Sequence, residues 1–154
     1  MSIYNTPLEE RFGEKLEELR EGKNMTREQL ADQVGLTARH IAALERDERR
    51  PTLNTMEKLL RTQFPDLASK YVRQFALLFL DLQKKCDSAE ISTKALDLRG
   101  MLDALRLIRR GIPAGAALDM GITNKAFDSY EQGLIRDVIA ARIPAKLDAA
   151  KLFA

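Results

Sequence analysis

The chain has 154 residues, of which 45% are hydrophobic, 31% charged and 6% aromatic. This length and composition allow one ordinary domain or two small ones around a buried core, and they exclude a chain dominated by disorder. The formal net charge of +2 neither requires nor excludes a polyanionic partner, because the distribution of charge matters more than its total.

The single cysteine, Cys86, excludes a disulfide framework within the chain and is typical of a reducing compartment. No apolar run approaches the roughly 20 residues that cross a bilayer, and the N-terminus lacks the basic start and apolar block of a signal peptide. We therefore expect a cytoplasmic protein without a membrane partner.

The N-terminal part of the chain begins with two predicted helices. The first covers about residues 8–23 and has an apolar stripe with the spacing of one helix face. The second follows "TREQ", a capping box formed by Thr26 and Gln29, and it ends at Gly35, which suits a left-handed turn. The stripe of the first helix is Phe12, Leu16 and Leu19.

Two more helices complete this part. Thr37 is the expected N-cap of a third helix that reaches about residue 46, and Pro51 closes the loop that follows. A fourth helix is predicted over residues 52–63. The residues expected on its buried side are Leu53, Met56, Leu59 and Leu60.

The C-terminal part predicts further helices separated by polar, proline and glycine breaks. Asp66 is the expected N-cap of a helix to about residue 85, and Ser92 and Thr93 are expected to start another that Gly111 stops. Pro113 suits the N1 position of a short helix. The last two helices are predicted over residues 124–142 and within 145–154.

No segment alternates apolar and polar residues with period two between turn signals, so we predict an all-α fold. We expect a first domain at residues 1–62 and a second small helical domain at residues 63–154, with the boundary near residues 62–66. Because the join is short, the two parts can pack as one body.

The stretch "QLADQVGLTARHIAALER" has the spacing that a helix-turn-helix requires. Two helices that cross closely need a small residue at the crossing, here Ala31, and a tight turn with positive φ, here Gly35. Thr37 caps the second helix, while Ile41 and Leu44 give it a buried side. In such a motif the second helix lies in the DNA major groove and the first braces it against the backbone.

Residues 12–60 resemble the helix-turn-helix of the Cro and lambda-repressor class, often called the XRE family. The resemblance implies a lambda-repressor-like domain of five helices that binds double-stranded DNA, usually as a homodimer on its operator. The matching segments are Leu30-Ala31, Gly35-Leu36-Thr37, Ile41, Leu44-Glu45-Arg46 and Pro51-Thr52-Leu53.

The resemblance also implies which residues contact the DNA backbone. Arg27 matches a position at the start of the bracing helix that commonly touches phosphate. Thr37 and His40 match positions near the backbone or the groove edge. The loop after the reading helix is expected to bring three cations near phosphates, namely Arg46, Arg49 and Arg50.

Base reading is implied for three positions of the second helix. Only Arg39 among them can donate a bidentate hydrogen bond, for which guanine is the natural acceptor. Ala38 and Ala43 offer apolar contact alone, as to a thymine methyl group. Asp47 stands where the family usually has glycine, and aspartate tolerates the left-handed turn less well than glycine does.

The charge of the N-terminal part leaves a second interpretation open. Residues 1–62 contain eleven Lys and Arg and twelve Asp and Glu, a net charge of −1, and six of the acids crowd the first helix. Many DNA-binding domains are more basic. A domain of this fold that no longer binds DNA is therefore the alternative.

Residues 65–142 resemble the C-terminal helical lid of MoxR-like AAA+ ATPases, most clearly in "ISTKALDLRGMLDALRLIRRG". The resemblance implies a phosphate-sensing position at Lys94 or Arg99. The chain lacks the glycine-rich loop G-x-x-x-x-G-K-[ST] that cradles phosphates, so no ATPase activity is expected. The segment would then serve as a packing or docking module.

A competing interpretation of the C-terminal part is a second helix-turn-helix. "AALDMGITNKAFDSYEQ" repeats the spacing of the first motif, with Thr123 as the N-cap and Asn124 and Lys125 at reading positions. The alternative for the same residues is a corner between helices that is packed for stability. The apolar correspondences pair Phe127 with Ile41 and Tyr130 with Leu44.

The sequence therefore predicts a transcriptional regulator that reads DNA with its N-terminal domain and dimerises or contacts a protein partner through residues 63–154. The alternative is a protein-interaction adaptor whose lid-like part docks on a AAA+ machine. His40 is the sole histidine, and no cofactor loop or nucleophile–base constellation is present. We expect neither an enzyme nor a cofactor or metal site.

Overall fold

The computed structural model describes residues 7–92 and 96–153, and within these ranges the chain is helical and contains no strand. The predicted all-α fold class is thus confirmed. The elements are α1 (Pro7–Gly22), α2 (Arg27–Val34), α3 (Ala38–Glu45), α4 (Leu53–Gln63), α5 (Ser69–Asp87), α6 (Leu98–Arg109), α7 (Ala114–Gly121), the short 3₁₀ helix η2 (Thr123–Lys125), α8 (Ser129–Arg142) and α9 (Ala149–Leu152).

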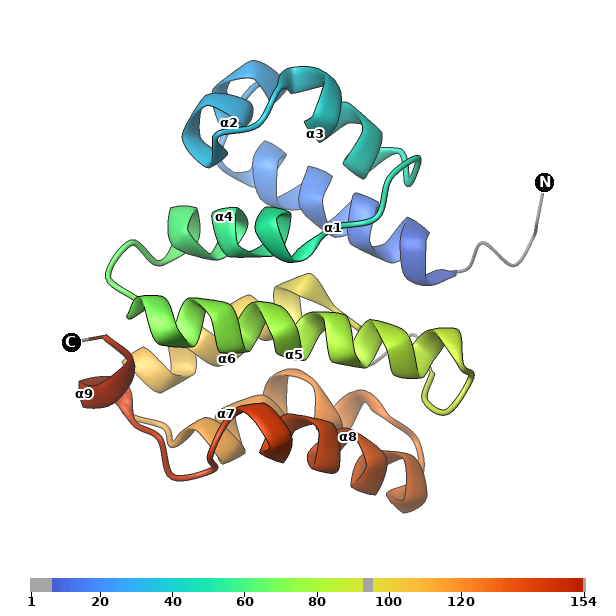
Figure 1. The fold of residues 1–154 in the computed structure, drawn as a ribbon, viewed down its shortest axis with the longest axis vertical. Coiled ribbons are helices and arrows are strands. Elements are labelled where there is room, and N and C mark those ends of the chain that lie inside the picture. The colour runs from blue at the N-terminus through green and yellow to red at the C-terminus, as the bar shows by residue number, and fades with distance from the viewer. Residues whose placement is uncertain (1–6, 93–95, 154) are drawn as a thin grey trace.

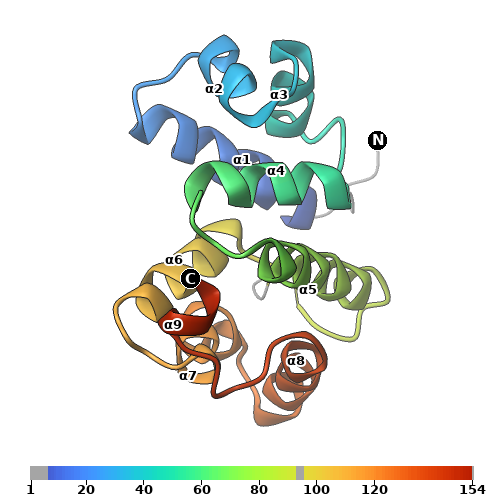
Figure 2. The same ribbon diagram turned by 60° about the vertical axis from the view of Figure 1, so that its left-hand side comes forward.

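The helices stack in layers along the longest axis of the molecule (Figure 1). The pair α2 and α3 forms one end and lies over α1 and α4, while α5, the longest of the described helices, runs through the middle. Beyond this layer, α8 packs against α5, while α6 contacts α1 and packs against α7 (Figure 2). The short helix α9 lies near the C-terminus. The helix-turn-helix segment therefore stands at one pole of the molecule.

A single hydrophobic cluster runs through both parts of the chain. At the junction, Phe12 of α1 meets Phe79 of α5 edge to face, with ring centroids 5.8 Å apart. Ion pairs add links at the surface between Glu18 and Arg99 and between Arg73 and Glu57. The two parts pack as one body.

The helix caps of the N-terminal part form as the sequence predicts. The Thr26 hydroxyl accepts a hydrogen bond from the Gln29 backbone, and the Gln29 side chain accepts one in return from the Thr26 backbone. Gly35 adopts the left-handed conformation with φ of 73°. The Thr37 hydroxyl accepts from the backbone N–H of His40 at 3.0 Å. These local contacts fix where α2 ends and α3 begins.

The start of α5 differs from the prediction. Asp66 is not its N-cap, because the helix begins at Ser69 after Ala68, whose side chain makes no capping hydrogen bond. Asp66 instead pairs with Arg109 of α6. The Arg109 guanidinium also lies 5.2 Å from the ring centroid of Phe64 and 4.5 Å from that of Phe153. The Asp66 carboxylate thus binds a residue distant in sequence and does not cap the helix.

Three other helix starts were also predicted wrongly. The helix expected to begin near Ser92 begins at Leu98, where Asp97 is the N-cap, and Thr93 lies outside the described residues. Pro113 is the N-cap of α7 and not its first helical residue. The helix predicted from Asn124 divides into η2 and α8, and the N-cap of α8 is Asp128.

Candidate nucleic-acid interface

The crossing of α2 and α3 is built by the small and apolar residues that the motif predicts. Ala31 is buried on α2, and Ile41 and Leu44 are fully buried on α3. Gly35 turns the chain between the two helices, and its carbonyl accepts a hydrogen bond from Lys58 of α4 at 3.0 Å. The buried side of α3 is thereby fixed against α2, so its other side faces outward.

The end of α3 approaches α1 at a glycine that the sequence interpretation missed. A Cβ atom on Gly13 would lie 2.4 Å from the carbonyl oxygen of Glu45, closer than real Cβ contacts. The backbone N–H of Gly13 donates to Asp47 Oδ1 at 3.1 Å, and Asp47 itself has a left-handed φ of 59°. The available signal of this close contact was a glycine inside the predicted first helix, directly after Phe12 of its apolar stripe.

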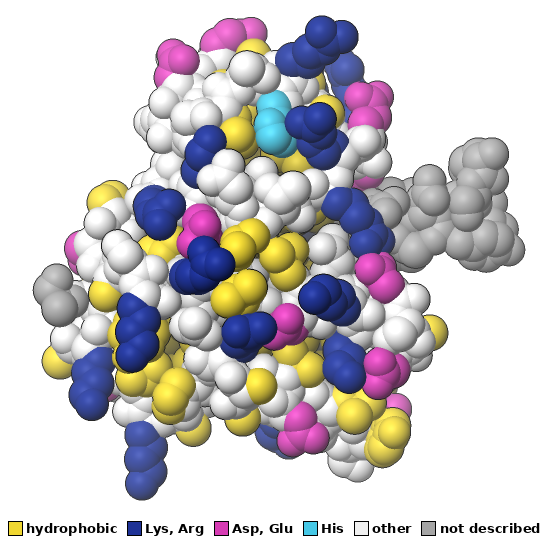
Figure 3. All heavy atoms as spheres, in the orientation of Figure 1, with side chains coloured by type: hydrophobic (Ala, Val, Ile, Leu, Met, Phe, Trp, Pro, Cys, Tyr) yellow, Lys and Arg dark blue, Asp and Glu magenta, His cyan; other side chains and the backbone are white. Residues whose placement is uncertain are grey.

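The outward side of α3 gathers most of the predicted contact residues. Arg39 is exposed, and its side chain forms no ion pair or hydrogen bond within the described ranges. Figure 3 shows the sole histidine at this end of the molecule, with a Lys or Arg side chain directly beside it and others nearby. A shallow hollow of about 330 Å³ lies here, lined by Thr37, Arg39, His40, Ala43, Glu48 and Arg49.

His40 is half-buried beside this hollow. Burial, and after it the charges of Arg49 and Lys58, lowers the pKa of the imidazole below its ordinary value. Its Nε2 atom is buried and makes no hydrogen bond to the residues that the structure describes. The ring is therefore neutral at pH 7 and carries a nitrogen with unused hydrogen-bonding capacity at the edge of the hollow.

Arg27 lies close to the surface but is already engaged. Its Nε donates to Oε1 of Glu45 at 2.9 Å, and Nε of Arg20 donates to Oε2 of the same carboxylate at 2.6 Å. The Glu45 side chain is only 1% exposed, and its hydrogen bond raises the pKa of Arg20 above the ordinary value. One carboxylate thus joins α1, α2 and α3, a role that the sequence interpretation did not foresee.

The cations after α3 divide into two groups. Arg46 and Arg49 are exposed, and neither forms an ion pair within residues 7–92 and 96–153. Arg50 forms a two-pronged ion pair with Asp87 at the end of α5, with N–O distances of 2.8 and 2.9 Å. Arg50 therefore ties the loop after α3 to the C-terminal part of the chain.

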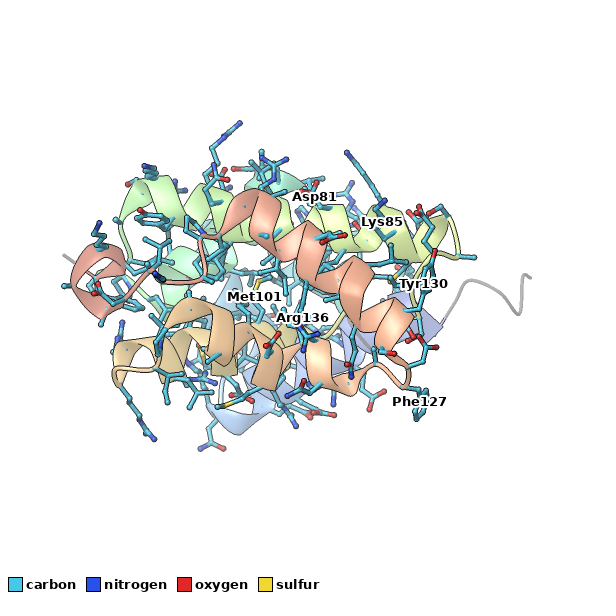
Figure 4. All side chains as sticks on the ribbon, turned by 90° about the horizontal axis from the view of Figure 1, so that it is seen from below. Asp81, Lys85, Met101, Phe127, Tyr130 and Arg136 are labelled. Atoms are coloured by element: carbon cyan, nitrogen blue, oxygen red, sulfur yellow. The ribbon has the colours of Figure 1, made fainter. Side chains whose placement is uncertain are left out.

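The second predicted reading site is contradicted by the structure. Thr123 is fully buried in η2 and caps no α-helix, so Asn124 does not begin a reading helix. Phe127 and Tyr130, the expected counterparts of buried residues, are 80% and 78% exposed. Figure 4 shows both side chains at the periphery, pointing away from the helices.

The other charged residues singled out in the C-terminal part have structural partners or lie outside the described ranges. Lys125 pairs with Asp97, the N-cap of α6; burial opposes ionisation of Asp97, but the hydrogen bond and charge of Lys125 hold its pKa below the ordinary value. Arg99 pairs with Glu18 of α1. Lys94 lies outside the described residues.

Comparison with protein families matches residues 16–62 to the family described as "Helix-turn-helix". Comparisons with curated proteins and with solved structures found no match. Residues 16–62 are thus a helix-turn-helix domain of the XRE family, in agreement with the crossing of α2 and α3. The lid resemblance of the C-terminal part stays a prediction. Within the described residues, no helix is long and apolar enough to cross a membrane.

Proposed function

Because residues 16–62 form an XRE-type helix-turn-helix, we propose that the protein is a sequence-specific DNA-binding transcriptional regulator. The observation that carries the proposal is the state of Arg39. This cation stands on the outward side of α3, while the buried side of the helix is fixed, and no carboxylate among the described residues neutralises it. An uncompensated guanidinium on a rigid reading helix is suited to the O6 and N7 atoms of guanine.

The residues around Arg39 are proposed to support its contact with the base. Ala38 and Ala43 are half-buried and allow α3 to approach the base edges closely. Thr37 is exposed at the start of α3, where a hydroxyl and backbone N–H groups suit a phosphate oxygen. Arg46 and Arg49 supply positive charge to the flanking backbone. His40 lies at the groove edge, where its neutral ring can contact a phosphate or a base.

The C-terminal part is proposed to provide a dimer contact. In the helix-turn-helix class, a two-fold dimer places two reading helices on half-sites about one DNA turn, 34–36 Å, apart. Such a dimer doubles the number of bases read. This role is compatible with a DNA partner, a cytoplasmic location and a protein that binds and does not catalyse.

The proposal is tested by selection from a random-sequence duplex pool at two salt concentrations, followed by sequencing. A regulator enriches one motif, and an inverted repeat within that motif reports the dimer. Binding that falls with salt but enriches no motif would describe a non-specific DNA binder, because phosphate contacts carry no sequence information. Absence of binding at low salt would refute DNA recognition.

A protein-interaction adaptor is the second candidate, and a specific observation favours it. Phe127 and Tyr130 expose large aromatic surface near the start of α8, which is typical of a protein contact. Two of the predicted phosphate contacts, Arg27 and Arg50, are engaged by carboxylates. A partner retained after nuclease treatment, and lost from a Tyr130→Ser variant but not from Arg39→Ala, would support the adaptor.

A further inference from the structure

A cavity of about 270 Å³ opens between α1 of the helix-turn-helix part and α6 of the C-terminal part. It is slightly smaller than the roughly 300–1,000 Å³ of pockets that hold drug-sized ligands, so it suits a small molecule. None of the residues proposed to contact DNA lines it. The proposed DNA recognition therefore leaves this cavity without a role.

The cavity combines an apolar wall with a charged rim. Leu98 and Leu102 are buried, and Leu19 is half-buried and packs against the core. Four cations and two carboxylates line the cavity around these leucines, which gives the rim a formal charge of +2. The cations are Lys15, Lys23, Arg99 and Arg106, and the acids are Glu18 and Asp103.

Each side of the rim has one more cation than acid. Glu18 is shared by Arg99 and by Lys15, whose Nζ lies 3.6 Å from the carboxylate, so one acid serves two cations. Arg106 pairs with Asp103 within its own helix at 2.8 Å. Lys23 is exposed and has no ion-pair partner within the described part of the chain. The rim thus lacks the negative charge that an anionic ligand would supply.

We propose that this cavity binds a small amphipathic anion, with the apolar body of the ligand against the leucines and its carboxylate among Lys15, Lys23 and Arg99. The carboxylate takes over part of the contact that Glu18 makes with Arg99. Burial of the apolar body supplies affinity, while the charged head selects the ligand class. This binding does not depend on the proposed DNA recognition.

The direct test is isothermal titration calorimetry of the full chain with octanoate, below its micellar concentration. Acetate has the head without the apolar body, and octylammonium has the body with the opposite charge. Octanoate is expected to bind at least about tenfold more tightly than either, a difference of about 1.4 kcal/mol. No detectable binding of octanoate, or equal binding of octanoate and octylammonium, would overturn the proposal.

Two pairs of variants locate the site. Lys23→Glu reverses a rim charge and is expected to weaken octanoate binding at least about threefold, whereas Lys146→Glu, the same change at an exposed residue outside the cavity, leaves it unchanged. Glu18→Gln removes the competing carboxylate and is expected to strengthen binding. Its control is Glu14→Gln, one helical turn away and exposed.

These residues lie on the surface or its margin, so folding is expected to survive each change, and circular dichroism verifies it. Opposite effects of Lys23→Glu and Glu18→Gln, with both controls silent, support the α1–α6 cavity. Equal effects of a rim variant and its control would show that octanoate responds to net charge elsewhere on the protein, which contradicts the assignment.

Discussion

Arg27 and Glu45 are joined by a hydrogen bond of 2.9 Å from Nε to Oε1, which places a predicted phosphate contact in the internal frame of the helix-turn-helix. Arg20 binds the other oxygen of the same carboxylate. Because Glu45 is buried and Arg20 is only 11% exposed, the three residues act as one network between α1, α2 and α3. The position of α3 depends on that network.

Replacing Glu45 with Gln is therefore expected to lower the free energy of unfolding by about 3 kcal/mol, because Arg20 keeps a largely buried charge without its closest counter-ion. Urea denaturation monitored by circular dichroism measures the change. The comparison is Arg50→Gln, which breaks the exposed pair with Asp87 and is expected to cost at most about 1 kcal/mol. Equal costs for the two variants would contradict the network.

The approach of α3 to α1 gives a second prediction, at Gly13. Alanine favours a helix by about 1 kcal/mol over glycine, but a Cβ here would lie 2.4 Å from a backbone oxygen. We expect Gly13→Ala to destabilise the protein by about 1–3 kcal/mol, the usual range for overpacking. Gly133→Ala in α8 meets nothing within 4 Å and is expected to stabilise it. Thermal unfolding of the two variants should thus shift in opposite directions.

The first motif shows what sequence can predict about this fold. The Thr26 and Thr37 caps and the Gly35 turn depend on residues three or four positions apart, so the local sequence specifies them. The engagement of Arg27 and Arg50 depends on partners 18 and 37 positions away. Spacing identifies a cation at the proposed reading surface, but only tertiary structure shows which carboxylate already binds it.

The second motif shows why spacing alone misled. Gly121 occupies the position that matches Gly35, yet it is the last residue of α7, where an added Cβ would be 2.3 Å from the carbonyl oxygen of Gly100. The absence of a side chain at Gly121 permits the close crossing of α6 and α7. It does not serve a left-handed turn, as it does at Gly35. The chain then turns at Ile122 with negative φ, and Thr123 is buried. The same pair of small residues thus arises from a different packing requirement.

A matched pair of truncations checks this difference. Leu44→Ala removes a fully buried side chain and is expected to cost about 2–5 kcal/mol. Tyr130→Ala, at the corresponding position of the second motif, removes a largely exposed ring and is expected to change stability by no more than about 0.5 kcal/mol. Denaturant unfolding distinguishes them, and a large loss for Tyr130→Ala would restore the second helix-turn-helix.

His40 gives a pH-dependent prediction. Burial first, and then Arg49 and Lys58, lowers the pKa of His40 in the folded protein below its value in the unfolded chain. The resulting stability is present above the unfolded pKa of about 6.5 and is lost as pH falls through the folded pKa. Relative to His40→Gln, the wild type should lose unfolding free energy on acidification from pH 8 to pH 5. Parallel pH profiles of the two proteins would contradict the burial of the ring.

Arg39 is proposed to read a base pair from the outward side of α3. The most direct measurement compares the wild type with Arg39→Ala on the selected duplex and on its single-base variants, by fluorescence anisotropy at fixed salt. We expect the variant to lose about 1–3 kcal/mol of discrimination at one guanine and to keep it elsewhere. Unchanged discrimination at every position, or a uniform loss across all sequences, would contradict base reading by Arg39.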